Sequence, residues 1–142
     1  MKKLLFGSFS LILLVTACNK SKDAPPAVTV ESVAGSYKIT SIMVSISGSP
    51  FVDGDYRDQC QKDDVIELKA DGTFIYHDLG TVCQPSGDMT STWQLDGNTI
   101  SSPDDDEING DITSFDGSTM EVTIVSNGGG TNTTVKTTLK KQ

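Results

Sequence analysis

The sequence is poor in the residues that most catalytic and metal-binding sites use. His77 is the only histidine among the 142 residues, which excludes a histidine-rich metal site. Serine is common, but no G-x-S-x-G stretch or comparable nucleophile elbow is present. The three cysteines include no C-x-x-C pair of the redox-active kind. We therefore expect a protein that is not an enzyme, with no catalytic residues and no cofactor.

Positive charge is also scarce. The chain has 11 lysines and arginines against 19 acidic residues, for a net charge of -8. An acidic surface repels phosphate backbones, so nucleic acid is excluded as an expected partner.

Long hydrophobic runs are missing as well. The main apolar segment, residues 4–15, is 12 residues long and is interrupted by Gly7, Ser8 and Ser10, whereas a membrane-spanning helix needs about 20. Lys2 and Lys3 precede this segment, and the small residues Thr16 and Ala17 follow it. This order is typical of a secretory signal peptide, which we assign to residues 1–17.

Cys18 directly follows the small residues, and Val15-Thr16-Ala17-Cys18 resembles a bacterial lipobox. The resemblance implies that the thiol of Cys18 receives a diacylglyceryl group and becomes the first residue after cleavage. Two or three acyl chains anchor a protein almost permanently, because each buried CH₂ contributes about 0.8 kcal/mol. Asn19 is not the aspartate of the inner-membrane retention signal. We expect a lipid anchor in the outer membrane, facing the periplasm or the cell surface.

Residues 18–27 form the expected tether, since "SKDAPPA" contains two prolines and no large apolar side chain. Residues 28–142 are then enough chain for one domain. Cleavage after residue 17 removes two lysines and no acid, so the net charge becomes -10.

Cys60 and Cys83 remain once Cys18 carries lipid. An exported chain favours disulfides, and two thiols allow one pairing. The bridge would close a loop of about 24 residues and contribute about 3 kcal/mol in the chain-entropy model.

Short runs rich in Thr, Val and Ile, separated by glycine turns, predict an all-β domain. One helical turn is expected at Val30–Ala34, before Gly35. Eight strands are expected, at residues 36–47, 64–69, 73–79, 89–95, 98–102, 107–114, 118–126 and 132–140.

Apolar alternation also predicts strand register. A three-residue loop Ala70-Asp71-Gly72 pairs Leu68 with Phe74 and Ile66 with Tyr76, which gathers four apolar side chains on one face. His77 then points to the other face.

Two further details follow from the same pattern. A two-residue Asp96-Gly97 turn would place Trp93 opposite Ile100. The first strand changes phase, because its apolar positions are odd up to Ile39 and even from Ile42, so we expect a β-bulge near Thr40 or Ser41.

Sequential hairpins with short loops predict an eight-stranded antiparallel up-and-down barrel. A two-sheet β-sandwich is the alternative. The opening Gly35-Ser36-Tyr37, the stretch Cys60-Gln61-Lys62-Asp63-Asp64, the turn Ala70-Asp71-Gly72-Thr73, and Cys83 and Trp93 resemble the lipocalin-like domain lipoproteins of Bacteroidota. That resemblance covers residues 28–140 and implies a small lipid-anchored barrel that binds an apolar ligand, without an agreed active site.

Four aromatic residues are the candidate ligand-binding set: Tyr37, Phe74, Tyr76 and Trp93. In a small barrel such side chains usually fill the interior, and they line a pocket where the interior is only partly filled.

The acidic stretch from Asp104 to Asp116 nearly matches a calcium loop. Its candidate ligands are Asp105, Glu107, Asn109 and Asp116. Two of them depart from the motif, Glu107 where Asp or Asn is preferred and Asp116 where a bidentate glutamate is normal. The alternative is an acidic hairpin whose Ile108 and Ile112 belong to a strand.

Two functions remain open. The first is binding of a small apolar or amphipathic molecule at the cell envelope. The second is a protein-interaction module of an envelope surface complex, with an unknown protein partner, a solid barrel core, and contacts made by the long connection Gly48–Asp63, a length at which loops are often functional. An open lumen would favour the first function and a solid core the second.

Overall fold

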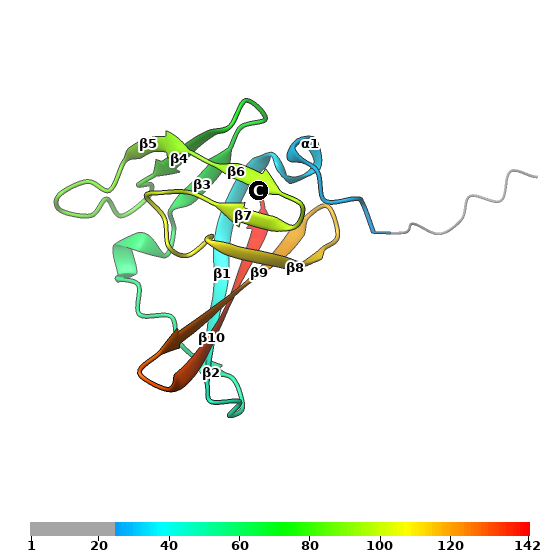
Figure 1. Cartoon of the computed structure of the whole chain (residues 1–142). Coiled ribbons are helices and arrows are strands. Elements are labelled where there is room, and N and C mark those ends of the chain that lie inside the picture. Colours follow the sequence, from blue (N-terminus) through cyan, green and yellow to red (C-terminus); the bar gives the residue numbers. More distant parts are fainter. Residues whose placement is uncertain (1–24) are drawn as a thin grey trace, which may run out of the picture.

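A computed structural model describes residues 25–142, and the signal peptide and Cys18 lie outside these residues. The described chain forms a nearly closed antiparallel barrel of nine strands (Figure 1). The hydrogen-bonded order is β5-β4-β3-β1-β10-β9-β8-β7-β6, and a short β2 pairs with β1. The expected all-β barrel is therefore confirmed, and the β-sandwich is not adopted.

The strands have the following bounds: β1 Gly35–Ile46, β2 Val52–Asp53, β3 Val65–Leu68, β4 Thr73–His77, β5 Met89–Thr92, β6 Gln94–Asp96, β7 Thr99–Ser101, β8 Gly110–Phe115, β9 Thr119–Gly128 and β10 Thr131–Lys141. A 3-10 turn η1 occupies Gln59–Gln61.

The strand expected at residues 89–95 is divided in two at Trp93. Its first half, β5, pairs with β4, and its second half, β6, pairs with β7. The two ends of the hydrogen-bonded path are thus consecutive in the chain, and the covalent link through Trp93 joins them. The structure has nine strands on this path where eight were predicted, because the strand expected at residues 89–95 bends at Trp93 and pairs with β4 before the bend and with β7 after it.

Helix α1, Val30–Val33, is the predicted helical turn. Thr29 caps it, because its hydroxyl accepts a hydrogen bond from the backbone N–H of Ser32, and the Thr29 N–H donates to the Ser32 hydroxyl. Val33 is fully buried, so the turn packs one side chain onto the barrel core. Among the residues described, no helix is long and apolar enough to cross a membrane.

Two register predictions are confirmed. Ile66 pairs with Tyr76 and Leu68 with Phe74, and Gly72 takes a φ of 86° in the three-residue loop. In β1 the pairing with β10 shifts between Ile39 and Ser41, which places the β-bulge at Thr40. The bulge lets Ile39 and Ile42 both face the core.

One register prediction is wrong. Leu95, not Trp93, lies opposite Ile100, and the turn is Gly97-Asn98. Gly97 has a φ of 60° at the first turn position, as a type II′ hairpin turn requires. The strand expected from Glu107 is also shorter than predicted, since β8 begins at Gly110 and Ile108 is a buried loop residue.

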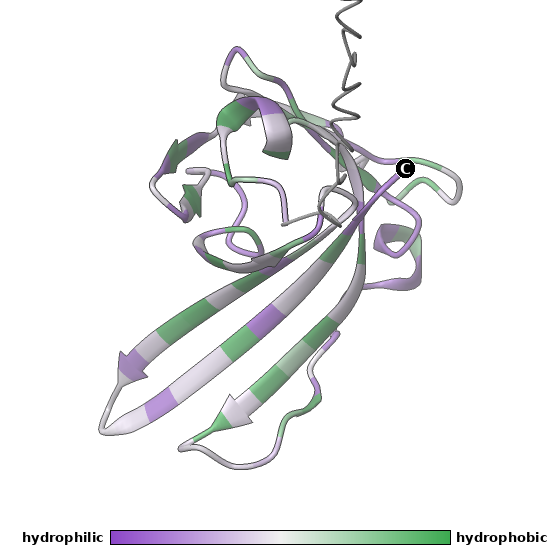
Figure 2. Ribbon diagram, turned by 90° about the vertical axis from the view of Figure 1, so that its right-hand side faces the viewer, coloured by the Kyte–Doolittle hydropathy of each residue, from purple (hydrophilic) through white to green (hydrophobic). Residues whose placement is uncertain are grey.

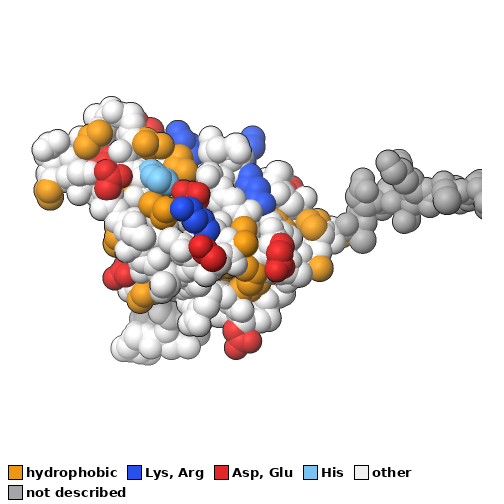
Figure 3. All heavy atoms as spheres, turned by 90° about the horizontal axis from the view of Figure 1, so that it is seen from above, with side chains coloured by type: hydrophobic (Ala, Val, Ile, Leu, Met, Phe, Trp, Pro, Cys, Tyr) orange, Lys and Arg blue, Asp and Glu red, His pale blue; other side chains and the backbone are white. Residues whose placement is uncertain are grey.

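The closed part of the barrel has a solid core. Its largest fully buried side chains include Tyr37, Phe74, Ile66, Leu68, Ile100 and Met120. Strands β1, β9 and β10 run on past this closed part as a three-stranded ribbon of alternating hydropathy (Figure 2). On the face seen in Figure 3, hydrophobic, basic and acidic side chains are interspersed.

Candidate functional site

An open hollow outside the core lies on the inner face of the projecting ribbon. β8 stops pairing with β9 at Thr123, and β3 stops pairing with β1 at Tyr37. Beyond these points the inner faces of β1, β9 and β10 are covered only by loops. The resulting open pocket has a volume of about 730 Å³, within the size range of small-molecule sites.

One wall of this pocket is apolar and comes from three strands. Ile42 of β1, Ile124 of β9 and Val135 of β10 line it, and Val135 pairs directly with Ile124. The bulge at Thr40 turns Ile42 to this side. The alternation of side chains along β9 and β10 places Ile124 and Val135 on the same face. Ile124 and Val135 are only partly buried and pack against the core. The wall is therefore a solvent-exposed continuation of the apolar core.

Thr137 lies in the same wall beside Ile42, its partner across the β1–β10 pair. It is fully buried, yet its Oγ1 has no hydrogen-bond partner among the described residues. A buried hydroxyl without a partner is unfavourable by about 1–3 kcal/mol. This atom is therefore an unsatisfied polar group in the pocket wall.

The segment after β2 forms the opposite wall. The Gly54 N–H donates to the Ile42 carbonyl at 2.9 Å, and a Cβ at Gly54 would lie 2.3 Å from the Cγ2 of Val44. Only glycine allows this close approach to β1 without displacing Val44. It brings Tyr56 and Arg57 to the pocket edge.

Arg57 is held rigidly by Asp55. The guanidinium donates from Nε to Oδ1 at 3.0 Å and from Nη2 to Oδ2 at 2.9 Å. Further donations go to the carbonyls of Ile39 and Gln61. The hydrogen bonds from Arg57 lower the pKa of Asp55. Burial disfavours the charge of Arg57, but the bonds and charge of Asp55 outweigh it and raise the pKa of Arg57.

Glu107 borders the pocket from the loop before β8. Burial, together with the nearby charge of Asp105, raises the pKa of Glu107, and Arg57 partly offsets this. Among residues 25–142 the Glu107 carboxylate has no hydrogen bond or ion pair, although its backbone N–H donates to Asp105 Oδ1 at 2.8 Å. A half-buried acid thus faces the pocket without a counter-charge in contact.

The four predicted aromatic residues take other positions. Tyr37, Phe74 and Trp93 are buried core residues. The Tyr37 hydroxyl donates to the Val33 carbonyl at 2.5 Å, and Trp93 Nε1 donates to the Lys69 carbonyl at 2.8 Å. Tyr37 and Phe74 do not line the 730 Å³ pocket, and Trp93 borders two other open hollows, of about 570 and 270 Å³.

Tyr76, the fourth, is partly buried, and its hydroxyl donates to Asp64 Oδ2 at 2.8 Å. It borders a smaller hollow of about 360 Å³ that Glu107 also borders.

The four candidate calcium ligands do not converge. Asp105 Oδ1 accepts the Glu107 N–H, and Asn109 Oδ1 accepts the Ser102 N–H at 2.6 Å. Asp116 lies past the far end of β8, roughly 20 Å from Asn109 at about 3.3 Å per strand residue. There its Oδ1 accepts the N–H groups of Ser118 and Thr119. The stretch is built as two separate turns.

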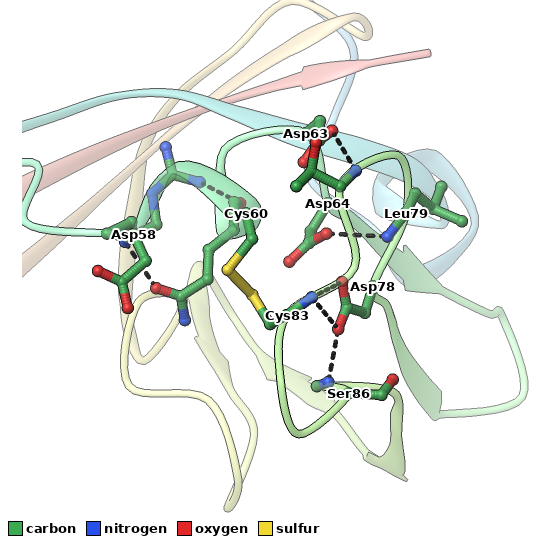
Figure 4. Close-up of a disulfide and its surroundings, with 12 residues drawn as sticks. Asp58, Cys60, Asp63, Asp64, Asp78, Leu79, Cys83 and Ser86 are labelled. Carbon is green, nitrogen blue, oxygen red and sulfur yellow. Dashed lines mark hydrogen bonds between the residues drawn. A yellow bond between two sulfur atoms is a disulfide. The ribbon is translucent and has the colours of Figure 1, made fainter.

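The predicted Cys60–Cys83 disulfide is present and joins η1 to the loop after β4 (Figure 4). Asp64 and Asp78 lie beside it, with oxygens within 4.8 Å of the Cys83 sulfur. These carboxylates accept the backbone N–H groups of Leu79, Cys83 and Gly87. The Cys83 sulfur is bonded to Cys60 in the disulfide and is therefore not free to bind a metal ion. The two aspartates order the loop through their hydrogen bonds.

Sequence reasoning missed the pocket residues Ile42, Ile124, Val135 and Thr137 as site residues. A signal for the site existed in the run Thr133–Thr137, where threonines replace the large apolar residues of a closed core. Arg57, on the long connection, was assigned to a protein contact surface and not to a pocket.

A nearly closed antiparallel barrel with a buried core defines a small all-β barrel protein. The model of the Lipocalin-like domain family matches residues 33–122. This is more than half of the chain, and the chain therefore belongs to the Lipocalin-like domain family, which is usually non-catalytic. No curated protein and no solved structure matches the chain. Ile124, Val135 and Thr137 lie beyond the matched range, so the match does not describe this wall of the pocket.

Proposed function

We propose that this chain is a lipid-anchored protein of the cell envelope whose barrel binds a small amphipathic molecule in the 730 Å³ pocket. One observation carries the binding proposal. An apolar wall of Ile42, Ile124 and Val135 stands open beside the buried, unpartnered hydroxyl of Thr137. An apolar body would cover the wall, and a polar group would reach the hydroxyl, which is the usual composition of a small-molecule site.

The anchoring part of the proposal depends on the sequence. Cys18 follows a short apolar segment and small residues, and Asn19 stands where a retention aspartate would be. The support is the lipobox resemblance and the expected tether to residue 27, which together favour the outer membrane.

Binding can be tested with N-phenyl-1-naphthylamine, a neutral probe whose fluorescence rises in apolar surroundings. The mature chain, residues 18–142 with Cys18→Ser, avoids competing lipid. We expect saturable binding that Ile124→Trp abolishes, because the indole would fill the pocket. Val125→Trp is the matched control, since Val125 is the next residue, faces the exterior and is 62% exposed.

Two results would contradict the proposal: no saturable binding by the parent chain, or equal loss in both tryptophan variants. If the probe binds as expected, native mass spectrometry of the same protein after incubation with a lipid extract of the producing cells would identify a natural ligand from its added mass.

A second function, a protein-interaction module, is favoured by the solid core of the closed barrel and by one surface feature. Large apolar side chains are exposed at the projecting end, including Ile46 at 55% and Val52 at 62%. Exposed apolar groups close together often mark contact surfaces. If the probe does not bind, a crosslinking search for an envelope partner on these residues is the next experiment.

A further inference from the structure

The charged side chains that line the pocket are few. They are Arg57, Asp106 and Glu107. Arg57 already has both oxygens of Asp55 and two backbone carbonyls as acceptors, and its side chain is only 9% exposed. Its positive charge is matched by Asp55, and four of its five N–H groups have acceptors, the Gln61 carbonyl being the most distant at 3.5 Å. The charge left facing the pocket is therefore negative.

Glu107 is held in place by its surroundings. The next residue, Ile108, is fully buried, and the Asn109 side chain accepts the Ser102 N–H at 2.6 Å. The N–H of Glu107 itself donates to Asp105 Oδ1. These contacts fix the backbone on both sides of Glu107 while leaving its carboxylate without a partner among the described residues. A ligand therefore has to order only the side chain of Glu107 and not its backbone.

Thr137 supplies an independent observation. It comes from a different element, β10, and its buried Oγ1 is unpartnered at the pocket wall. A hydroxyl both donates and accepts. The pocket lining thus includes two carboxylates, the Thr137 hydroxyl and an apolar surface, and it contains no lysine.

We propose that the ligand is a cationic amphiphile, an amine with an apolar body. Its ammonium group binds the Glu107 carboxylate, and its body lies on Ile42, Ile124 and Val135. This inference rests on the proposed function, since it names the chemical class that the pocket takes. An anionic amphiphile, such as a fatty acid, would place its carboxylate beside Glu107 and Asp106, where like charges repel and raise the cost of binding.

Three ligands of equal chain length test the charge: dodecylamine, dodecanol and dodecanoate. Each would displace N-phenyl-1-naphthylamine from residues 18–142 carrying Cys18→Ser, at pH 7.5 and below its micelle concentration. We expect dodecylamine to bind at least ten-fold more tightly than dodecanoate, with dodecanol between them. Glu107→Gln should reduce that preference to three-fold or less while leaving dodecanol affinity within two-fold.

Glu121→Gln is the matched control. It removes the same charge from the chain, but Glu121 lies on the outer face of β9 and pairs with Lys136 at 3.0 Å. The preference for the amine should remain in this variant. If it falls as much as in Glu107→Gln, the preference reflects overall charge, and the assignment to Glu107 is wrong.

The outcomes separate the two proposals. If dodecanoate binds as well as dodecylamine, the pocket stands as a binding site but the inference about its ligand fails. If neither the probe nor any of the three amphiphiles binds, the proposed function itself fails. Unchanged selectivity in Glu107→Gln would also overturn the inference.

Discussion

At the scale of single residues, the Arg57–Asp55 pair illustrates how a charged contact supports a pocket wall. Asp55 is 17% exposed and Arg57 9% exposed at their side chains. Salt screening is therefore weaker here than at the His77–Glu67 pair, whose side chains are 36% and 30% exposed. The two pairs have similar N···O distances, 2.9 and 3.0 Å, but the His77–Glu67 pair has opposite charges only when His77 is protonated.

We expect Asp55→Asn to lower the free energy of unfolding by about 1–3 kcal/mol at pH 7, as is usual for a lost hydrogen bond to a charged group. Glu67→Gln should cost less than about 1 kcal/mol, as exposed pairs do. Urea unfolding of both variants measures the difference. Equal losses would show that the Arg57 pair does not hold the wall.

The same substitution carries a pH prediction. Arg57 lowers the pKa of Asp55 in the folded protein. This stabilisation is fully present above the ordinary pKa of an aspartate in the unfolded chain, about 3.9, and is lost as the pH falls through the lowered pKa. The gap in unfolding free energy between the parent and Asp55→Asn should therefore shrink in acid. A gap that stays constant down to pH 2 would be inconsistent with this origin.

Thr137 leads to a stabilising prediction. Valine has nearly the same shape as threonine and no hydroxyl, so Thr137→Val removes the unpartnered buried oxygen. We expect the free energy of unfolding to rise by about 1 kcal/mol. Thr138→Val, on the outward face of the same strand, should change it by less than about 0.5 kcal/mol. Chemical denaturation checks both, and a destabilised Thr137→Val would mean that the hydroxyl already has a partner.

At the scale of secondary-structure elements, the bulge in β1 decides which side chains line the pocket. Strand side chains alternate, so removing one residue reverses the facing of those beyond it. Without Thr40, Ile42 would leave the inner face unless β1 shifted its pairing. We expect deletion of Thr40 to cost several kcal/mol, comparable with losing more than one core side chain.

Thr40→Ala is the control for the deletion. It keeps the bulge and loses only the hydrogen bond from Thr40 Oγ1 to the Thr138 carbonyl at 3.2 Å, which is expected to cost about 0.5–1.5 kcal/mol. Thermal unfolding followed by circular dichroism distinguishes the two variants. A tolerated deletion would show that the bulge does not set the register.

The disulfide acts on the two loops at one end of the barrel. It joins residues 23 apart in the sequence. The hydrogen bonds that Asp64 and Asp78 accept from the N–H groups of Leu79, Cys83 and Gly87 do not depend on the disulfide. We expect Cys60→Ala with Cys83→Ala to lose about 3 kcal/mol of unfolding free energy. Urea unfolding measures this loss, and the parent protein with reductant should match the variant. If both thiols of the parent, denatured but not reduced, react with a maleimide, the bridge is absent.

At the scale of the whole molecule, the proposed anchor separates location from binding. Cys18→Ser should move the protein from the membrane fraction to the soluble fraction of fractionated cells, because the acyl chains supply the attachment. Probe binding by the barrel should be unchanged, since all the residues that line the pocket fall in the range 42–137 of the sequence and Cys18 is not among them. Continued membrane attachment of the variant would contradict the lipid anchor.

Local patterns were enough to predict much of this barrel. The Leu68–Phe74 hairpin was predictable because one glycine loop and four apolar residues agree on a single register. The bulge followed from a change of phase that only an extra residue can reconcile. The Leu95–Ile100 hairpin was not predictable, because Asp96-Gly97 and Gly97-Asn98 are both acceptable turns and Trp93 and Leu95 are both apolar enough to face Ile100.

The sequence by itself determined the strand pattern, the one pairing open to Cys60 and Cys83, and the family. Only the tertiary structure decided that Tyr37, Phe74 and Trp93 fill a solid core while Ile124, Val135 and Thr137 line an open pocket. The physical reason is that burial depends on where neighbouring strands stop pairing. β8 leaves β9 at Thr123 and Gly54 packs over Val44, and both contacts join residues too far apart in the chain for periodicity to reveal them.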